Sequence, residues 1–96
     1  MYAISVMFDI EPDHIEDFKA AALAHADNSK TNEKGCLGFA VFQSYDREDR
    51  FYFHEVYESK AAVDEVHGKA PYLAEFGRIT KPWILKKELE TWESAE

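Results

Sequence analysis

Residues 36–58 read CLGFAVFQSYDREDRFYFHEVYE, two runs rich in aromatic and β-branched residues on either side of a polar segment. Val, Phe and Tyr favour strands because their side chains pack well on a pleated surface. The polar segment, DRED at residues 46–49, is typical of a surface turn. The whole stretch therefore predicts an antiparallel β-hairpin with a loop of about four to five residues.

The segment before the hairpin predicts one strand and one helix. Residues 2–10, YAISVMFDI, carry an apolar side chain at every second position, which is the period of a strand. Beyond Pro12, apolar residues recur at spacings of three and four up to about Thr31, which is the period of a helix. We expect Asp13 to accept hydrogen bonds from the free N–H groups of the first turn, and Gly35 to end the helix in a left-handed conformation.

The segment after the hairpin predicts a second helix, a short third helix and a last strand. Ser59 is suited to cap a helix that runs through His67, and Gly68 interrupts this helix. Pro71 is well placed in the first turn of the short helix, and residues 83–92, WILKKELETW, alternate weakly as a strand. The order β-α-β-β-α-β is that of an α+β ferredoxin-like sandwich, in which two helices cover one face of a four-stranded antiparallel sheet.

Length and composition restrict the possible functions. A chain of 96 residues, 46% hydrophobic and 15% aromatic, is expected to fold as one domain over residues 1–96. Its net charge of −8 repels phosphate backbones and anionic lipid headgroups, so we expect neither nucleic acid nor a membrane as a partner. The start of the chain lacks the basic residues of a signal peptide, and the lone Cys36 allows no internal disulfide. These features favour a cytoplasmic protein.

Both faces of the predicted hairpin carry large apolar side chains. One face is expected to present Leu37, Phe39, Val41, Phe51, Phe53 and Tyr57, and the other Ala40, Phe42, Tyr52 and Val56. Because two helices cover only one face, a monomer would expose an apolar patch larger than soluble monomers usually tolerate. We therefore expect a homodimer in which the sheets of two copies pack face to face. The alternation alone leaves open which face forms the interface.

Three segments carry a resemblance to a known family: GCLGFAVFQS at 35–44, DRFYFHEVYES at 49–59 and HGKAPYLAEF at 67–76. In this order they resemble the antibiotic biosynthesis monooxygenase domain family, small dimeric α/β-barrel proteins that include cofactor-free quinone-forming oxygenases and a quorum-signal isomerase. The resemblance covers nearly the whole chain and implies the same fold and a dimeric α/β barrel. Its members differ in their reactions, so the resemblance gives an activity only by analogy. The chain departs from the family at Tyr72, where members often have His.

Three titratable residues are the predicted catalytic groups, each with a structural alternative. His25 lies on the same helical stripe as Phe18, so we expect it to face the sheet, where it acts as a proton shuttle or simply bonds the backbone. Glu55 alternates with apolar neighbours, and burial would raise its pKa toward neutrality unless it forms an ion pair. His67 ends the second predicted helix, where it either faces the pocket or caps the helix.

The remaining predicted site residues are aromatic. We expect them to bind the substrate, the tyrosines by hydrogen bonds and the others as apolar walls, although aromatic side chains also build ordinary cores. They are Phe39, Phe53, Tyr57, Tyr72, Phe76 and Trp83. The chain has no glycine-rich phosphate loop and no cysteine cage, and its histidines lack the close spacing of a zinc site, so we expect no cofactor and no metal.

Three functions fit these residues. The first is a cofactor-independent monooxygenase on a small phenol, quinol or enol, whose deprotonated form passes an electron to O₂ when a base and a dry pocket are supplied. The second is an isomerase or tautomerase of a small hydroxy-ketone, which uses the same proton transfers without oxygen. The third is a non-catalytic ligand-binding dimer module. Oxygen uptake separates the first two functions, and loss-of-function variants separate both from the third.

Overall fold

The computed structural model describes residues 1–96, which form three helices and four strands. The elements are β1 Tyr2–Ile10, α1 Ile15–Asn32, β2 Cys36–Gln43, β3 Arg50–Tyr57, α2 Lys60–Glu65, α3 Pro71–Thr80 and β4 Ile84–Glu93. The strands form one antiparallel sheet in the order β2-β3-β1-β4. This topology confirms the predicted α+β ferredoxin-like fold.

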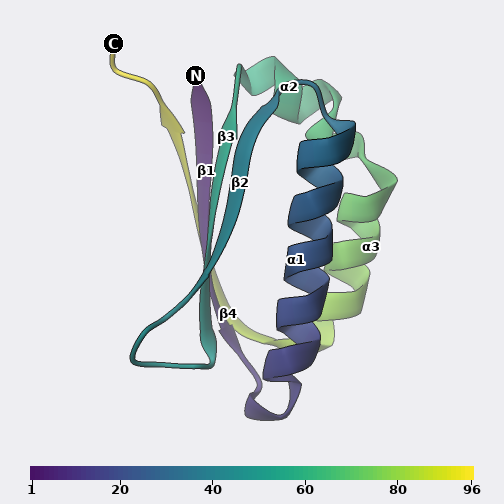
Figure 1. Cartoon of the computed structure of the whole chain (residues 1–96), viewed down its shortest axis with the longest axis vertical. Helices are drawn as coiled ribbons and strands as arrows, with labels where there is room; N and C mark the ends of the chain where they lie inside the picture. Colours follow the sequence, from purple (N-terminus) through teal and green to yellow (C-terminus); the bar gives the residue numbers. More distant parts are fainter.

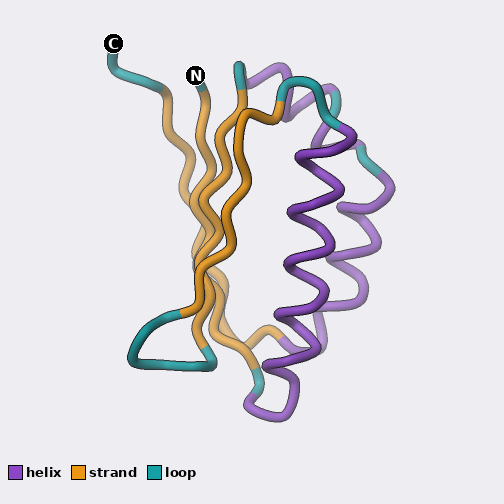
Figure 2. The backbone as a smooth tube through the Cα atoms, viewed as in Figure 1, coloured by secondary structure: helices purple, strands orange, loops and turns teal.

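All helices lie on the same side of the sheet, as Figure 1 and Figure 2 show. The inward side chains of β1, β2 and β3 pack against α1, because its apolar residues repeat at the helical period. This core consists of Ile4, Val6, Phe8, Ile10, Phe18, Ala22, Ala26, Phe39, Phe51, Phe53 and Tyr57. We call this covered side of the sheet the inner face. None of the helices combines the length and the apolarity needed to cross a lipid bilayer.

The opposite side of the sheet, the outer face, has no helix over it (Figure 1). It nevertheless carries three large aromatic side chains: Phe42 is 53% exposed, Tyr52 37% and Trp92 52%. Tyr52 and Trp92 also make polar contacts along the face, from the Tyr52 hydroxyl to His54 Nδ1 at 3.2 Å and from Trp92 Nε1 to Ser5 Oγ at 2.9 Å. The structure thereby assigns Phe42 and Tyr52 to the solvent side of the hairpin.

One residue of the predicted inner face is displaced by an irregularity in the hairpin. The β2–β3 register shifts between Cys36 and Gly38, so the alternation of side chains is broken there. Leu37 consequently lies in solvent while Phe39, two residues on, is buried. The prediction that Leu37 shares a face with Phe39 is therefore wrong.

The ends of α1 differ from the prediction. Residues 12–14 form a 3-10 turn, and no side chain caps the first turn of α1, so the capping role expected of Asp13 is wrong. No glycine has a positive φ, so Gly35 does not adopt a left-handed conformation either. Gly35 is instead required for close packing, because a Cβ atom there would lie 2.7 Å from the Cβ of Ala62 in α2.

The second predicted helix is shorter than expected. The Ser59 side chain accepts a hydrogen bond from Ala62 N–H, which confirms the predicted cap, but α2 ends at Glu65. The chain leaves the helix at Val66 (φ −121°, ψ −69°), one residue before His67, which belongs to a following 3-10 turn over residues 67–69. This turn places the buried His67 side chain over the inner face. Pro71 then opens α3 as predicted.

Candidate active site

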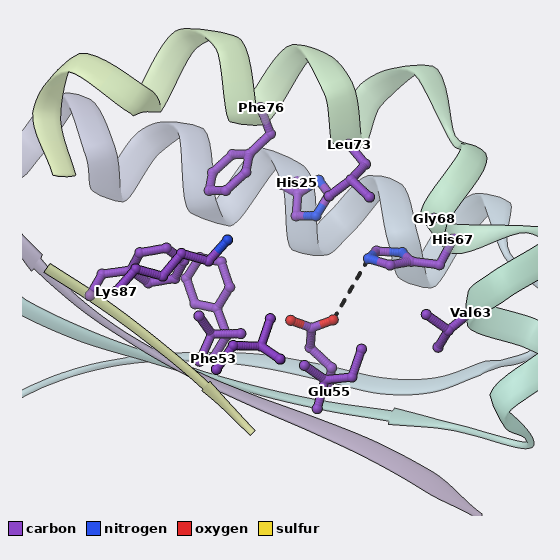
Figure 3. A pocket seen from close by; sticks show the side chains of 13 residues that line it. His25, Phe53, Glu55, Val63, His67, Gly68, Leu73, Phe76 and Lys87 are labelled. Atoms are coloured by element: carbon purple, nitrogen blue, oxygen red, sulfur yellow. Dashed lines mark ion pairs between the residues drawn. The ribbon is translucent and has the colours of Figure 1, made fainter. Parts of the chain in front are cut away.

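A cavity of about 240 Å³ lies between the inner face of the sheet and the helices. Figure 3 shows side chains from the sheet, from α1 and α3 and from the turn after α2 converging on it. Most of its 13 lining residues are apolar, including Ile4, Val6, Phe8, Phe53, Leu73 and Phe76. The titratable groups that line it are His25, Glu55, His67 and Lys87. A few polar groups in an apolar cavity are typical of a small-molecule site.

His67 is held by a buried acid, Glu33. Its Nδ1 lies 2.9 and 3.1 Å from the two oxygens of the Glu33 carboxylate, and both side chains are almost completely buried. Glu33 follows the last residue of α1, where an extended backbone (φ −115°, ψ 109°) ends the helix. Because a carboxylate only accepts hydrogen bonds, Nδ1 carries the proton and donates it to this contact. In the neutral form of the ring, this tautomer leaves the lone pair on Nε2.

The lone pair of His67 lies on the side of a second buried acid, Glu55. Nε2 is 3.7 Å from Glu55 Oε1, as the dashed line in Figure 3 marks, which is too long for a direct hydrogen bond. The Tyr57 hydroxyl donates a hydrogen bond of 2.7 Å to the same oxygen. Burial raises the pKa of Glu55, and the hydrogen bond from Tyr57 only partly opposes this. Glu55 is thus a carboxyl group that exchanges protons closer to neutral pH than usual.

A second tyrosine extends this row of neighbouring polar groups. The Tyr72 hydroxyl donates to Glu33, the acid that also holds His67. Burial raises the pKa of both Tyr57 and Tyr72, so both remain protonated hydrogen-bond donors. We call the connected groups the acid–histidine chain; in order they are Tyr72, Glu33, His67, Glu55 and Tyr57.

His25 lies beside this chain but is not connected to it by hydrogen bonds. Its ring is stacked on Phe76 with centroids 4.6 Å apart, and its centroid is 5.6 Å from that of His67. The side chain is 4% exposed, and its buried Nδ1 has no hydrogen-bond partner. Burial, reinforced by the nearby His67, lowers the pKa of His25 from 6.5 to about 4. His25 is therefore neutral at pH 7.

The structure brings most of the predicted site residues together. His25, Glu55, His67, Phe53 and Phe76 all line the cavity. The turn after α2 carries His67 back over the sheet, and this places its ring next to that of His25.

The other predicted residues lie around the cavity or away from it. The Phe39 ring packs behind the two histidines, 5.4 Å from His25. Tyr57 and Tyr72 contact the two buried acids. Trp83 does not line the cavity and is stacked on His14, with centroids 5.2 Å apart.

Sequence reasoning missed two residues of the site. Glu33 lies four residues after Ser29, which is itself four residues after His25, so the helical stripe that aims His25 at the sheet extends to Glu33. That spacing was a usable signal. Lys87 lies in a strand whose alternation is weak, and only its pairing with Phe8 shows that it faces inward. Among the His, Cys, Asp and Glu side chains, no group of three or more is arranged to hold a metal ion.

Comparison with known proteins identifies the family. The family model described as antibiotic biosynthesis monooxygenase matches residues 1–78. The chain belongs to this family. A relative in Synechocystis, the uncharacterized protein sll1783, is 28% identical over 88 residues, and the chain spans 58% of that protein's length.

Solved structures of several other bacterial proteins share the fold. A protein of Nitrosomonas europaea named for this family superposes with a TM-score of 0.92 at 22% identity, with both chains covered completely. A protein of Caulobacter crescentus CB15, also named for this family, superposes with a TM-score of 0.91 at 24% identity. The match covers 99% of this chain and 90% of the Caulobacter chain. PA3566 from Pseudomonas aeruginosa superposes with a TM-score of 0.89 at 19% identity. The match covers 99% of this chain and 94% of PA3566.

Proposed function

We propose that this family member is a cofactor-independent monooxygenase that acts on a small phenol, quinol or enol. The observation that carries the proposal is the Glu33–His67 pair, which leaves the Nε2 lone pair of a buried imidazole at an apolar cavity. A carboxylate that orients a histidine and stabilises its protonated form is a common arrangement for a general base. The family to which the chain belongs adds support for oxygen chemistry.

In the proposed reaction His67 Nε2 accepts the proton of the substrate hydroxyl, and Glu33 stabilises the resulting imidazolium. The substrate anion then transfers one electron to O₂, and the radical pair combines to form a carbon–oxygen bond. The O–O bond of this peroxide breaks, and one oxygen leaves as water with the hydroxyl proton and the proton lost from the ring carbon. A phenol and O₂ thus give a quinone and water, and the substrate supplies all the electrons.

The groups around His67 have distinct roles in this proposal. Glu55, whose pKa is raised, donates a hydrogen bond to the substrate oxyanion in its protonated form. Phe53 and Phe76 keep the cavity apolar, which excludes water from the radical pair. Tyr72 fixes the Glu33 carboxylate and so holds His67 indirectly.

The proposal is tested by a screen of quinols, catechols, naphthols and phosphorylated hydroxy-ketones with an oxygen electrode and mass spectrometry. We expect oxygen uptake with one substrate class and incorporation of one ¹⁸O atom from ¹⁸O₂ into the product. His67→Gln should lower kcat by about 10²- to 10⁴-fold, the usual loss for a missing general base. The matched control is His54→Gln, because His54 lies next to Glu55 on β3 but is exposed on the outer face, so its turnover should equal that of the wild type.

Two outcomes would contradict the monooxygenase. Turnover of a hydroxy-ketone without oxygen uptake would instead identify an isomerase or tautomerase that uses the same base. No turnover of any compound, together with no compound that raises the melting temperature, would leave a non-catalytic dimer module.

A further inference from the structure

The cavity has an unpaired cation at the end opposite the acid–histidine chain. Lys87 lines the cavity, and its ammonium nitrogen lies 5.9 Å from the centroid of the Phe8 ring. Figure 3 shows this nitrogen pointing into the cavity toward Phe76, from the end opposite His67. The position follows from the register of β4, since Lys87 pairs with Phe8, whose side chain belongs to the inner face.

Lys87 differs from its neighbours on the same strand. Lys86 pairs with Asp9 and Glu88 with Met7, so both alternate to the other side of β4, where they form an ion pair of 3.1 Å. Lys87 forms no ion pair, although the chain contains 19 acidic residues. Lys87 is an exposed residue of the edge strand β4, so its ammonium group stays hydrated in the free protein and is available to an anion that enters the cavity.

The walls of the cavity restrict the rest of the ligand. Phe8, Phe53 and Phe76 surround the space between Lys87 and His67, and aromatic side chains pack well against a flat ring. An apolar cavity of roughly 150 Å³ takes up benzene, so about 240 Å³ accommodates one or two fused rings.

Charge also orients such a ligand. The Glu33 carboxylate behind His67 repels a ligand carboxylate at that end, whereas Lys87 at the other end attracts it. We propose that the substrate is a planar aromatic hydroxy acid, whose carboxylate is bound by Lys87 while its hydroxyl lies at His67. The assignment of the hydroxyl as the reacting group rests on the proposed function; the assignment of the carboxylate to Lys87 does not.

The test compares each acid with its neutral primary amide, which has nearly the same shape. The probes are 4-hydroxybenzoate and 6-hydroxy-2-naphthoate with the corresponding amides, and affinity is measured by calorimetry at constant ionic strength. At least one acid should bind the wild type about 10- to 100-fold more tightly than its amide, the factor for one hydrogen bond to a charged group. Lys87→Gln should remove this preference and leave amide binding within about twofold.

The matched control is Lys86→Gln, which removes the same charge from the adjacent, outward-facing residue and should leave acid binding unchanged. Equal binding of acid and amide to the wild type, binding of neither, or equal loss in the Lys86 and Lys87 variants would each overturn the proposal. Lys87-dependent binding of an acid without oxygen uptake would overturn the monooxygenase but retain this inference. Turnover of neutral phenols that is insensitive to Lys87→Gln would retain the monooxygenase but overturn this inference.

Discussion

The two faces of the sheet are both aromatic, yet only one is covered. Phe51 and Tyr52 are consecutive residues of β3, but the first is buried under α1 and the second lies in solvent. The inner face obtains its core and its cavity from the helices that cover it, whereas the outer face has comparable side chains and no cover within the chain. Strand alternation therefore determines which residues share a face, while burial depends on what packs against that face.

The largest difference between the faces should appear in stability. Phe51→Ala removes a fully buried ring that packs on Phe18, and should lower the free energy of unfolding by about 3–5 kcal/mol. Tyr52→Ala on the outer face should cost less than about 1 kcal/mol in a monomeric chain. Chemical denaturation at low protein concentration measures both values. Equal losses in the two variants would mean that the faces are equally covered.

The covered face should also respond to pH through His25. Its pKa is about 4 in the folded protein and 6.5 in the unfolded chain, so the unfolded chain binds more protons between these values. The free energy of unfolding should therefore fall as the pH drops from 6.5 to 4, by roughly 3 kcal/mol at most. The raised pKa of Glu55 acts in the opposite direction, because the folded state then binds more protons above pH 4.5.

The contribution of His25 can be isolated with His25→Phe. The variant should lack the loss of stability below pH 6.5, so its curve of unfolding free energy against pH should diverge from that of the wild type. Denaturant titrations from pH 7 to pH 4 give both curves. Two parallel curves would show that His25 is not held neutral by the fold.

The outer face is tested by its capacity for self-association. We propose that a second copy covers it, and we expect a sedimenting particle of twice the 11.1 kDa of one chain at micromolar concentration. Phe42→Asp should weaken association by about 100-fold, close to 2.7 kcal/mol, because it places an unpaired charge in an apolar interface. Tyr45→Asp, on the fully exposed hairpin loop, is the control. A wild-type monomer would contradict the proposed cover.

The smallest expected effect concerns the packing of α2 at the end of the hairpin. Gly35→Ala places a Cβ atom 2.7 Å from that of Ala62, so α2 must shift, at a cost of about 1–2 kcal/mol. Gly38→Ala is the control, because a Cβ atom there meets no atom within 4 Å. Melting temperatures should fall only for the first variant. The same shift separates Glu33 from His67, so kcat of the Gly35 variant should fall as well.

The strands and the topology could be predicted because their signals are local. Alternation in β1 and β3, the Ser59 cap and Pro71 at the start of α3 each act through near neighbours in the chain. The errors at Leu37 and Gly35 have a different origin. A shift of register and a close contact between two elements are set by tertiary packing, which a single sequence does not display.

The sequence allowed most residues of the site to be predicted, but not the hydrogen bonds between them. His25, Glu55 and His67 were identified from their positions on expected faces, and all three line the cavity. Glu33 was missed although its spacing of four residues from Ser29 continues the stripe that aims His25 at the sheet. Trp83 was included on chemical grounds alone, and it lies with His14 away from the cavity.

The weak anchoring of α2 has a kinetic consequence. Its six residues contain no buried side chain, yet it is followed directly by the turn that holds His67. Segments with little buried surface open locally at a lower free energy than the core, which makes their amide protons exchange early. Such an opening would lift His67 away from Glu33 while the sheet stays intact. Amide exchange of residues 60–69 should therefore report how often the base is disconnected, independently of global unfolding.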